Sequence, residues 1–112
     1  MSMKSTKLVK GSLQTIILKL LKENKRMYGY EICKCVSSLS EGDIAITEGA
    51  LYPALHKLET DGLLSVEIEK IQNRNRKYYS LTKLGGLEVV SRIEALEQFL
   101  SSLNKVLNPK LI

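Results

Sequence analysis

The sequence has few of the residues that metal sites and enzymes need. It contains no tryptophan, one phenylalanine, one histidine and two cysteines. A structural zinc site takes four ligands, and Cys33, Cys35 and His56 together supply three. The two cysteines are two positions apart in a predicted helix, where such side chains do not face one another, so we expect no disulfide. The sequence also has no glycine-rich phosphate loop, no HExxH helix and no histidine-supported nucleophile. We therefore expect no metal, no cofactor and no enzymatic activity.

Long apolar runs are also missing. The longest run of large apolar residues, Ile16–Leu18, is far shorter than the ~18–20 residues that span a bilayer. The chain begins with a basic segment, but Gln14, Lys19 and Lys22 interrupt the apolar stretch behind it, and no small-residue cleavage site follows. We expect no transmembrane helix and no export signal, and hence a cytoplasmic protein.

The size and composition are those of one small folded domain. The chain has 112 residues, of which 44% are hydrophobic and 26% are charged. This length is below the ~150 residues that serve as a prior for one domain. The composition argues against a disordered or low-complexity chain.

The net charge of +5 is unevenly distributed along the chain. Residues 1–26 carry seven bases and one acid, and residues 70–83 carry five bases and no acid. Residues 27–69 between them carry two bases and eight acids, whereas residues 84–112 are neutral. Concentrated positive charge attracts polyanions, so nucleic acid or an anionic surface is a candidate partner. The alternative is that these segments are the solvated faces of an ordinary basic protein.

Two short helices are predicted in the first 40 residues. Apolar residues from Leu13 to Leu21 follow helical spacing, which predicts a helix from about Ser12, its N-cap, to Glu23. We expect residues 1–10 to form a flexible basic arm in front of it. The apolar residues between positions 30 and 39 predict a second helix that ends near Ser38. Its expected stripe contains Tyr30, Cys33 and Val36, with Ile32 and Leu39 beside them.

A third helix is predicted between Thr47 and Gly62. Thr47 can cap it, Glu48 lies at the positive end of its dipole, and Gly62 ends it. Its expected core stripe consists of Leu51, Leu55 and Leu58. Pro53 is unfavourable inside a helix unless the helix begins one or two residues before it.

Beyond Gly62 the hydrophobic period changes from 3.6 to 2. Leu64, Val66 and Ile68 alternate with polar residues, which predicts a strand with one buried face. Residues 72–75 are polar and turn-prone, and Asn73 and Asn75 tolerate a positive φ. Residues 77–81 predict a second strand. The two strands form a β-hairpin with a basic tip.

The last predicted helix is long, and its apolar residues have the spacing of a coiled coil. Thr82 caps it, and it runs to about Leu107, which corresponds to roughly 38 Å. Leu84, Leu87 and Val90 form a second stripe that we expect to cover the N-terminal helices. We expect a homodimer, with packing against residues 12–23 of the same chain as the alternative. The expected seam, at alternating steps of four and three residues, consists of Val89, Ile93, Leu96, Leu100, Leu103 and Leu107.

This order of elements predicts a mainly α (α+β) fold, a winged helix-turn-helix with a two-stranded wing and a long C-terminal dimerisation helix. Residues 1–81 form the expected DNA-binding domain, and residues 82–112 form the dimerisation helix of the same compact unit. In such a domain the third helix enters the major groove, while the wing contacts phosphates or the minor groove.

Three stretches, in this order, resemble the PadR family of transcriptional regulators. They are YGYEI at residues 28–32, TEGALYPALHKLETDGLL at residues 47–64, and RNRKYYSLTKLG at residues 74–85. The resemblance extends from about residue 11 to residue 107 and is to the small subgroup without a separate C-terminal helical domain. It implies a bacterial repressor that is dimeric through its last helix and binds a pseudo-palindromic double-stranded DNA operator. It also implies release from the operator by a small hydrophobic or aromatic effector.

The resemblance assigns functional roles to particular residues. Tyr52 and Pro53 match the family's Tyr-Pro signature, and the wing departs from the common Gly-Arg-Pro-Arg at residues 73–76. Some small members stack a flat drug between tryptophans, which this chain lacks; Leu96 and Phe99 are its expected effector contacts. The expected DNA-binding residues are Tyr28, Thr47, Glu48, Tyr52, Pro53, His56, Lys57, Asn73, Arg74, Asn75, Arg76 and Lys77.

The third helix is less basic than a simple DNA-binding helix. Glu48, Lys57, Glu59 and Asp61 sum to −2. We therefore expect most of the phosphate affinity to come from the wing and the N-terminal lysines, with bases read by uncharged groups such as Thr47. Two alternatives stay open. The acidic third helix fits a winged-helix adaptor that binds proteins without specific DNA binding, and the basic N-terminus fits a peripheral membrane binder.

Overall fold

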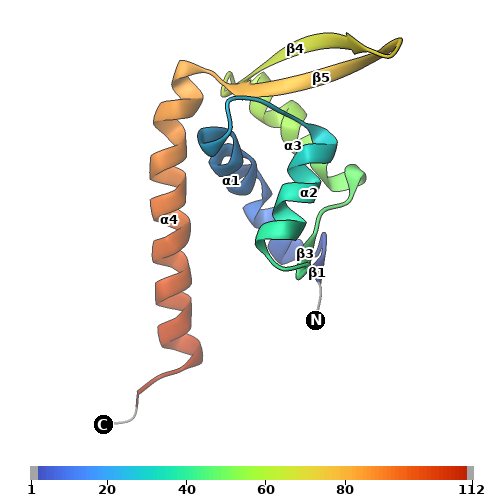
Figure 1. The fold of residues 1–112 in the computed structure, drawn as a ribbon. Coiled ribbons are helices and arrows are strands. Elements are labelled where there is room, and N and C mark those ends of the chain that lie inside the picture. The colour runs from blue at the N-terminus through green and yellow to red at the C-terminus, as the bar shows by residue number, and fades with distance from the viewer. Residues whose placement is uncertain (1–2, 111–112) are drawn as a thin grey trace.

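The computed structural model describes residues 3–110, which form four helices and five strands. Helices α1, α2 and α3 pack against one another, a long β-hairpin projects from one end, and α4 runs along one side (Figure 1). In chain order the elements are β1 (Met3–Lys4), α1 (Lys7–Glu23), β2 (Met27–Tyr28), α2 (Gly29–Leu39), β3 (Ile44–Ala45), α3 (Glu48–Thr60), β4 (Leu64–Ile71), β5 (Arg74–Leu81) and α4 (Lys83–Leu107).

Two small sheets connect these helices. The larger has the strand order β2-β5-β4, and both pairs are antiparallel. Its register places Tyr28 opposite Tyr78 and Leu64 opposite Leu81. The smaller sheet pairs β1 with β3 in parallel. The β4–β5 hairpin is the wing. Strand β2 pairs only with the base of β5, so the outer part of the wing has no third strand beside it.

Helix α1 begins five residues earlier than predicted. Thr6, not Ser12, is its N-cap, and the Thr6 hydroxyl accepts a hydrogen bond from the N–H of Val9 at 3.3 Å. The extra turn forms because Val9 extends the buried stripe by one turn. The predicted flexible arm is therefore wrong over residues 7–10, which are helical, and over residues 3–4, which form β1. Residues 1–2 of the predicted arm lie outside the described residues.

The core lies between the three short helices, the base of the wing and the first turns of α4. The predicted stripe of α3 is confirmed, since Leu51, Leu55 and Leu58 are fully buried. In α2 the buried side chains are Ile32 and Val36. The predicted stripe of α2 was too wide, because Tyr30 and Leu39, near the two ends of the helix, are exposed.

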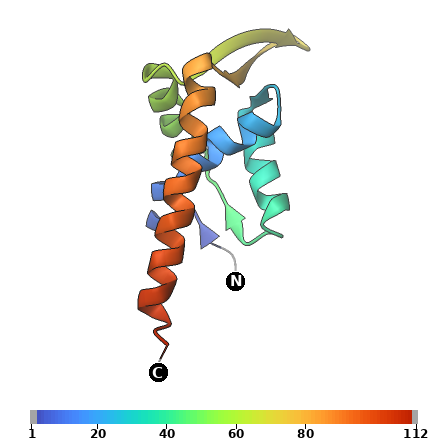
Figure 2. The same ribbon diagram turned by 90° about the vertical axis from the view of Figure 1, so that its left-hand side faces the viewer.

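Helix α4 has two halves with different surroundings. In the near half, Val89 is completely buried, and the Arg92 guanidinium donates to Gln14 of α1 at 2.9 Å. In the far half, every residue from Glu97 to Leu107 is exposed, and the helix extends away from the body (Figures 1 and 2). No helix within residues 3–110 has the length and hydropathy needed to cross a membrane.

The second stripe predicted for α4 is wrong. Leu84, Leu87 and Val90 are exposed and do not cover the N-terminal helices. By helical spacing, Leu84 and Leu87 point away from the side of α4 that carries Val89, the residue that faces the core, and Val90 lies at the edge between the two sides. A helix can bury only one side against a single layer of neighbours.

Candidate nucleic-acid interface

Helix α3 presents an uncharged outer face. Thr47 caps it as predicted, and its hydroxyl accepts from the N–H of Ala50 at 3.3 Å. Lys57 lies to one side of this face, where its ammonium donates to Asp61 at 2.9 Å. The outermost residues, which helical spacing brings to one exposed side, are Gly49, Tyr52, Pro53, His56 and Thr60.

Pro53 lies well inside α3, a position that is unfavourable for proline unless the helix begins just before it. The helix starts at Glu48, and Thr47 is still its N-cap. Pro53 has no N–H, so the carbonyl of Gly49 has no donor one turn later. Pro53 and Gly49 are both exposed, which leaves this carbonyl on the outer face. The proline is tolerated because this part of the helix faces outward.

The side chain of Tyr52 lies against the start of α2. A β-carbon at Gly29 would be 2.6 Å from the Tyr52 hydroxyl oxygen and 3.1 Å from the ring carbon that carries it. Only glycine leaves room for the ring in this position. Tyr52 is 46% exposed, so one side of the ring faces outward. Gly29 thus sets where the predicted DNA-contacting tyrosine lies.

The tip of the wing is a two-residue turn. Strand β4 ends at Ile71 and β5 begins at Arg74, so the turn consists of Gln72 (φ 48°) and Asn73 (φ 64°). Positive φ at both central residues is typical of a type I′ turn, which matches the twist of a hairpin. Asn73 therefore confirms its predicted tolerance of positive φ, whereas Asn75 lies in the strand. The second strand starts three residues before the predicted one because the turn is shorter.

A groove of about 740 Å³ lies between the wing, the start of α2 and α3. Tyr28 and Gly29 line it from β2 and α2, and Tyr52 lines it from α3. From the wing, Arg74, Arg76 and Lys77 line it. The fold thus gathers residues from all three stretches of the sequence that carry the family resemblance.

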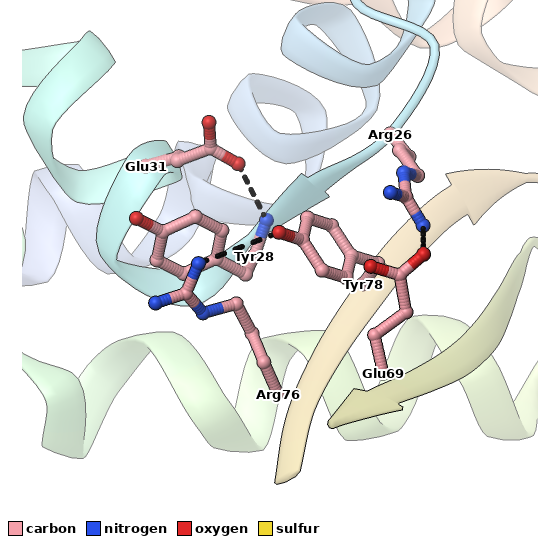
Figure 3. Close-up of polar contacts among 6 residues, drawn as sticks. All are labelled: Arg26, Tyr28, Glu31, Glu69, Arg76 and Tyr78. Atoms are coloured by element: carbon pink, nitrogen blue, oxygen red, sulfur yellow. Dashed lines mark hydrogen bonds and ion pairs between the residues drawn. The ribbon is translucent and has the colours of Figure 1, made fainter. Parts of the chain in front are cut away.

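Two arginines and two tyrosines form an array beside this groove (Figure 3). The Arg76 guanidinium lies 4.1 Å from the centre of the Tyr28 ring and donates to the Tyr78 hydroxyl at 3.4 Å. The two tyrosine rings meet edge to face, 5.5 Å apart. Arg26 lies 4.0 Å from the centre of the Tyr78 ring and pairs with the Glu69 carboxylate at 2.6 Å.

The charges of this array are mutually stabilising. The ion pair with Arg26 lowers the pKa of Glu69, mainly through their hydrogen bond. The same bond to Glu69 is the main reason that the pKa of Arg26 is raised. The hydrogen bond to the Tyr78 hydroxyl raises the pKa of Arg76. Both guanidinium groups and the carboxylate therefore stay charged at neutral pH.

The other predicted residues lie outside the groove, with the exception of Asn75. Thr47 and Glu48 are exposed at the start of α3, and His56 is exposed one turn beyond Tyr52. Lys4 lies in β1, at the end of the molecule away from the wing (Figures 1 and 2). Asn73 is exposed at the wing tip, whereas Asn75 is exposed and lines the groove.

The predicted dimerisation and effector residues are divided between the two halves of α4. Val89 is covered by its own protomer and cannot reach a partner, so the predicted seam loses its first member. Ile93 packs against the same core. The other members lie beyond it, with Leu96 half-buried and Leu100, Leu103 and Leu107 exposed. Phe99 is 60% exposed beside them.

Sequence reasoning missed four residues of the site: Arg26, Gly29, Glu69 and Tyr78. Gly29 is part of the YGYEI stretch, so its place between two tyrosines was a signal of close approach. Arg26 and Glu69 are 43 positions apart. They meet only because β4 and β5 pair and β2 joins the opposite edge of β5, and no local pattern shows this.

The chain is similar to known regulators in sequence and in structure. The sequence profile of the transcriptional regulator PadR-like family matches residues 17–96. An uncharacterized protein of Lysinibacillus sphaericus is 34% identical over 79 residues, which are 70% of this chain and 72% of that protein. A transcriptional regulator of Mycobacterium tuberculosis is 38% identical over 60 residues, 54% of this chain and 56% of the relative.

Solved structures of similar proteins agree. A transcriptional regulator from Clostridium thermocellum is 31% identical, with a TM-score of 0.81 over 89% of this chain and 97% of that one. A PadR-family transcriptional regulator from Eggerthella lenta is 34% identical, with a TM-score of 0.71 over 92% and 88% of the two chains. The predicted fold class, including the long last helix, is confirmed. The family, the M. tuberculosis relative and the two solved structures are transcriptional regulators and not enzymes. The chain belongs to the PadR-like family of transcriptional regulators.

Proposed function

We propose that this PadR-family regulator is a sequence-specific DNA-binding repressor that acts as a homodimer. The observation that carries the proposal is the groove between the wing, α2 and α3, because it places cationic wing residues beside the outer face of α3. In a winged helix, α3 enters the major groove and the wing contacts the adjacent backbone. Arg74 and Lys77 supply phosphate contacts in this arrangement.

The composition of α3 supports base reading over bulk charge attraction. Its outermost residues are uncharged, and Gly49 has open space where a side chain would be. A bare backbone at this position lets α3 approach the floor of the major groove. Tyr52 and His56 then reach base edges or the nearest phosphates, whereas the wing supplies the sequence-independent part of the affinity.

The far half of α4 supports the homodimer. Its exposed apolar side chains include Phe99, Leu100, Leu103, Val106 and Leu107. A helix with these residues on its surface and no neighbour in its own chain favours burial against another helix. Two copies related by a two-fold axis would present two α3 helices to a pseudo-palindromic operator, with half-sites about 34 Å apart.

The same region is the proposed place of a small hydrophobic or aromatic effector. Leu96 and Phe99 lie where the near and far halves of α4 meet. A ligand held there between two protomers would change the distance between their α3 helices. Release from the operator would follow from a difference in effector affinity between the bound and free arrangements.

DNA binding is tested by fluorescence anisotropy with the promoter upstream of the protein's own gene and a scrambled duplex of equal length. We expect the promoter to bind ~10³-fold more tightly at physiological salt, with two chains per duplex. Equal and salt-labile binding to both duplexes would contradict sequence specificity. Absence of binding would favour the protein-adaptor alternative. Repression is tested with a reporter gene placed behind the same promoter. If the protein is a repressor, expression of the reporter should rise when the regulator is removed.

A further inference from the structure

The array of Figure 3 joins segments that are far apart in the chain. Arg26 comes from the connection between α1 and β2, and Tyr28 lies at the junction of β2 and α2. Tyr78 and Arg76 belong to β5, and Glu69 belongs to β4. The contacts therefore connect both strands of the wing to the body of the protein.

The wing needs such contacts because little else fixes its direction. Its base is buried, as Leu64 and Tyr79 show. Further out, Ile68 is 60% exposed, so no apolar layer supports the outer part of the hairpin. A two-stranded ribbon without a core beneath it is free to bend and twist about its base.

The two fixed points lie at the same level of the wing. Glu69 pairs with Arg76 in the strand register. Arg26 contacts Glu69, which belongs to β4, and Tyr28 contacts Arg76, which belongs to β5. One strand is thus attached through an ion pair and the other through a cation–π contact, which together resist rotation of the hairpin better than either attachment alone.

The chemistry of Arg26 fits this role. Its planar guanidinium can lie on the Tyr78 ring and still donate in its own plane to Glu69, which a lysine ammonium cannot do. The Glu69 carboxylate also offsets the repulsion between Arg26 and Arg76 on this face. Arg26 does not line the groove between the wing and α3.

We propose that Arg26 and Glu69 are positioning residues of the DNA interface. They hold the wing at the angle to α3 at which Arg74 and Lys77 reach the DNA backbone. The inference rests on the DNA-binding function proposed above, and it adds two residues that act through the wing without contacting DNA.

The sharpest test is the variant Glu69→Gln, because a pure charge effect and a positioning effect predict opposite changes in DNA affinity. Loss of a negative charge from the wing should tighten DNA binding if charge alone matters. Our proposal predicts binding about fivefold weaker, the change expected when a charge-assisted hydrogen bond becomes a neutral one. The matched control is Glu67→Gln, which removes the same charge two residues earlier and should bind as tightly as the unaltered protein or more tightly. Equal or tighter binding by Glu69→Gln would overturn the proposal.

A second variant tests the stacking of Arg26. Arg26→Lys keeps the charge but loses the planar contact with Tyr78, so we expect a loss of about fivefold, like that of Glu69→Gln. Lys25→Ala removes a neighbouring exposed charge and serves as the control. Wild-type affinity of Arg26→Lys would show that charge, and not the geometry of the array, is what matters.

The orientation of the wing is also measured without DNA. Residual dipolar couplings of the amides in residues 70–77, compared with those in α1–α3, report the angle and order of the wing. We expect Glu69→Gln and Arg26→Lys to reduce the couplings in the wing only, whereas unchanged couplings would overturn the proposal. If the unaltered protein binds no DNA, the proposed function fails, and these couplings still decide whether Arg26 and Glu69 orient the wing.

Discussion

At the residue scale, two glycines show that the cost of adding a side chain depends on whether the neighbouring atoms can move. At Gly29 the missing β-carbon would meet the far end of the Tyr52 side chain, which can rotate. At Gly85 it would overlap the backbone carbonyl of Leu63. That carbonyl also accepts from the N–H of Thr82 at 3.1 Å, so it cannot move without breaking the junction between the wing and α4.

Gly85→Ala should therefore destabilise the protein, although alanine is the better helix former. We expect the free energy of unfolding to fall by about 1–3 kcal/mol, the usual size of an overpacking effect. Urea denaturation followed by circular dichroism measures it. Gly86→Ala is the matched control, because the next position is exposed and open. It should raise stability by up to about 1 kcal/mol, and similar effects of the two variants would contradict this reading of Gly85.

At the element scale, the wing shows that local sequence predicts a strand but not how much of it is buried. The alternation of Leu64, Val66 and Ile68 predicted a strand with one buried face. Only the first of these is fully buried, since the pattern continues beyond the edge of the core. Strand periodicity reports which residues share a face, but it does not say how far the core extends beneath them.

Arg74 at the tip is the simplest test of the wing as a phosphate-binding element. It is exposed, whereas Arg76 is partly covered by Tyr28. Arg74→Ala should weaken binding to the operator and to a scrambled duplex by similar factors. It should also flatten the slope of log K against log salt by about 0.9, the value for one lost phosphate contact. Anisotropy titrations at several salt concentrations measure both, and a loss confined to the operator would instead assign Arg74 to base reading.

At the scale of the whole molecule, the two halves of α4 have different roles. Its near half is part of the protomer core through Val89, and its far half extends past the body with apolar side chains exposed. Both ideas raised by the sequence, packing within the chain and pairing between chains, therefore concern different halves of one helix. The first is what the near half does, and the second stays a proposal for the far half.

Leu100→Asp tests that proposal. Leu100 is 54% exposed, so the protomer should fold normally, while a carboxylate in an apolar helix pair carries a large desolvation cost. We expect monomers in sedimentation velocity where the unaltered protein is a dimer. Ser101→Asp, which adds the same charge one residue off the seam, should remain dimeric. A Leu100→Asp protein that stays dimeric would place the interface elsewhere.

The order and type of the main elements follow from the amino-acid sequence alone, because their signals are local. The caps Thr47 and Thr82, the stripe of α3 and the change of period after Gly62 each depend on residues within a few positions of one another. The boundaries that failed, such as the start of α1, depended on burial that only the folded chain supplies.

Which residues meet at the candidate interface, in contrast, depends on how the chain folds. Arg26 reaches Glu69 across 43 positions because three strands align, and Gly29 accommodates Tyr52 because α2 and α3 cross there. The structure also decided which side of α4 faces the core: Val89 is buried, whereas Leu87 is exposed. Burial of an apolar residue is favourable against any partner. Its presence in the sequence therefore favours burial, but does not identify the element or chain that covers it.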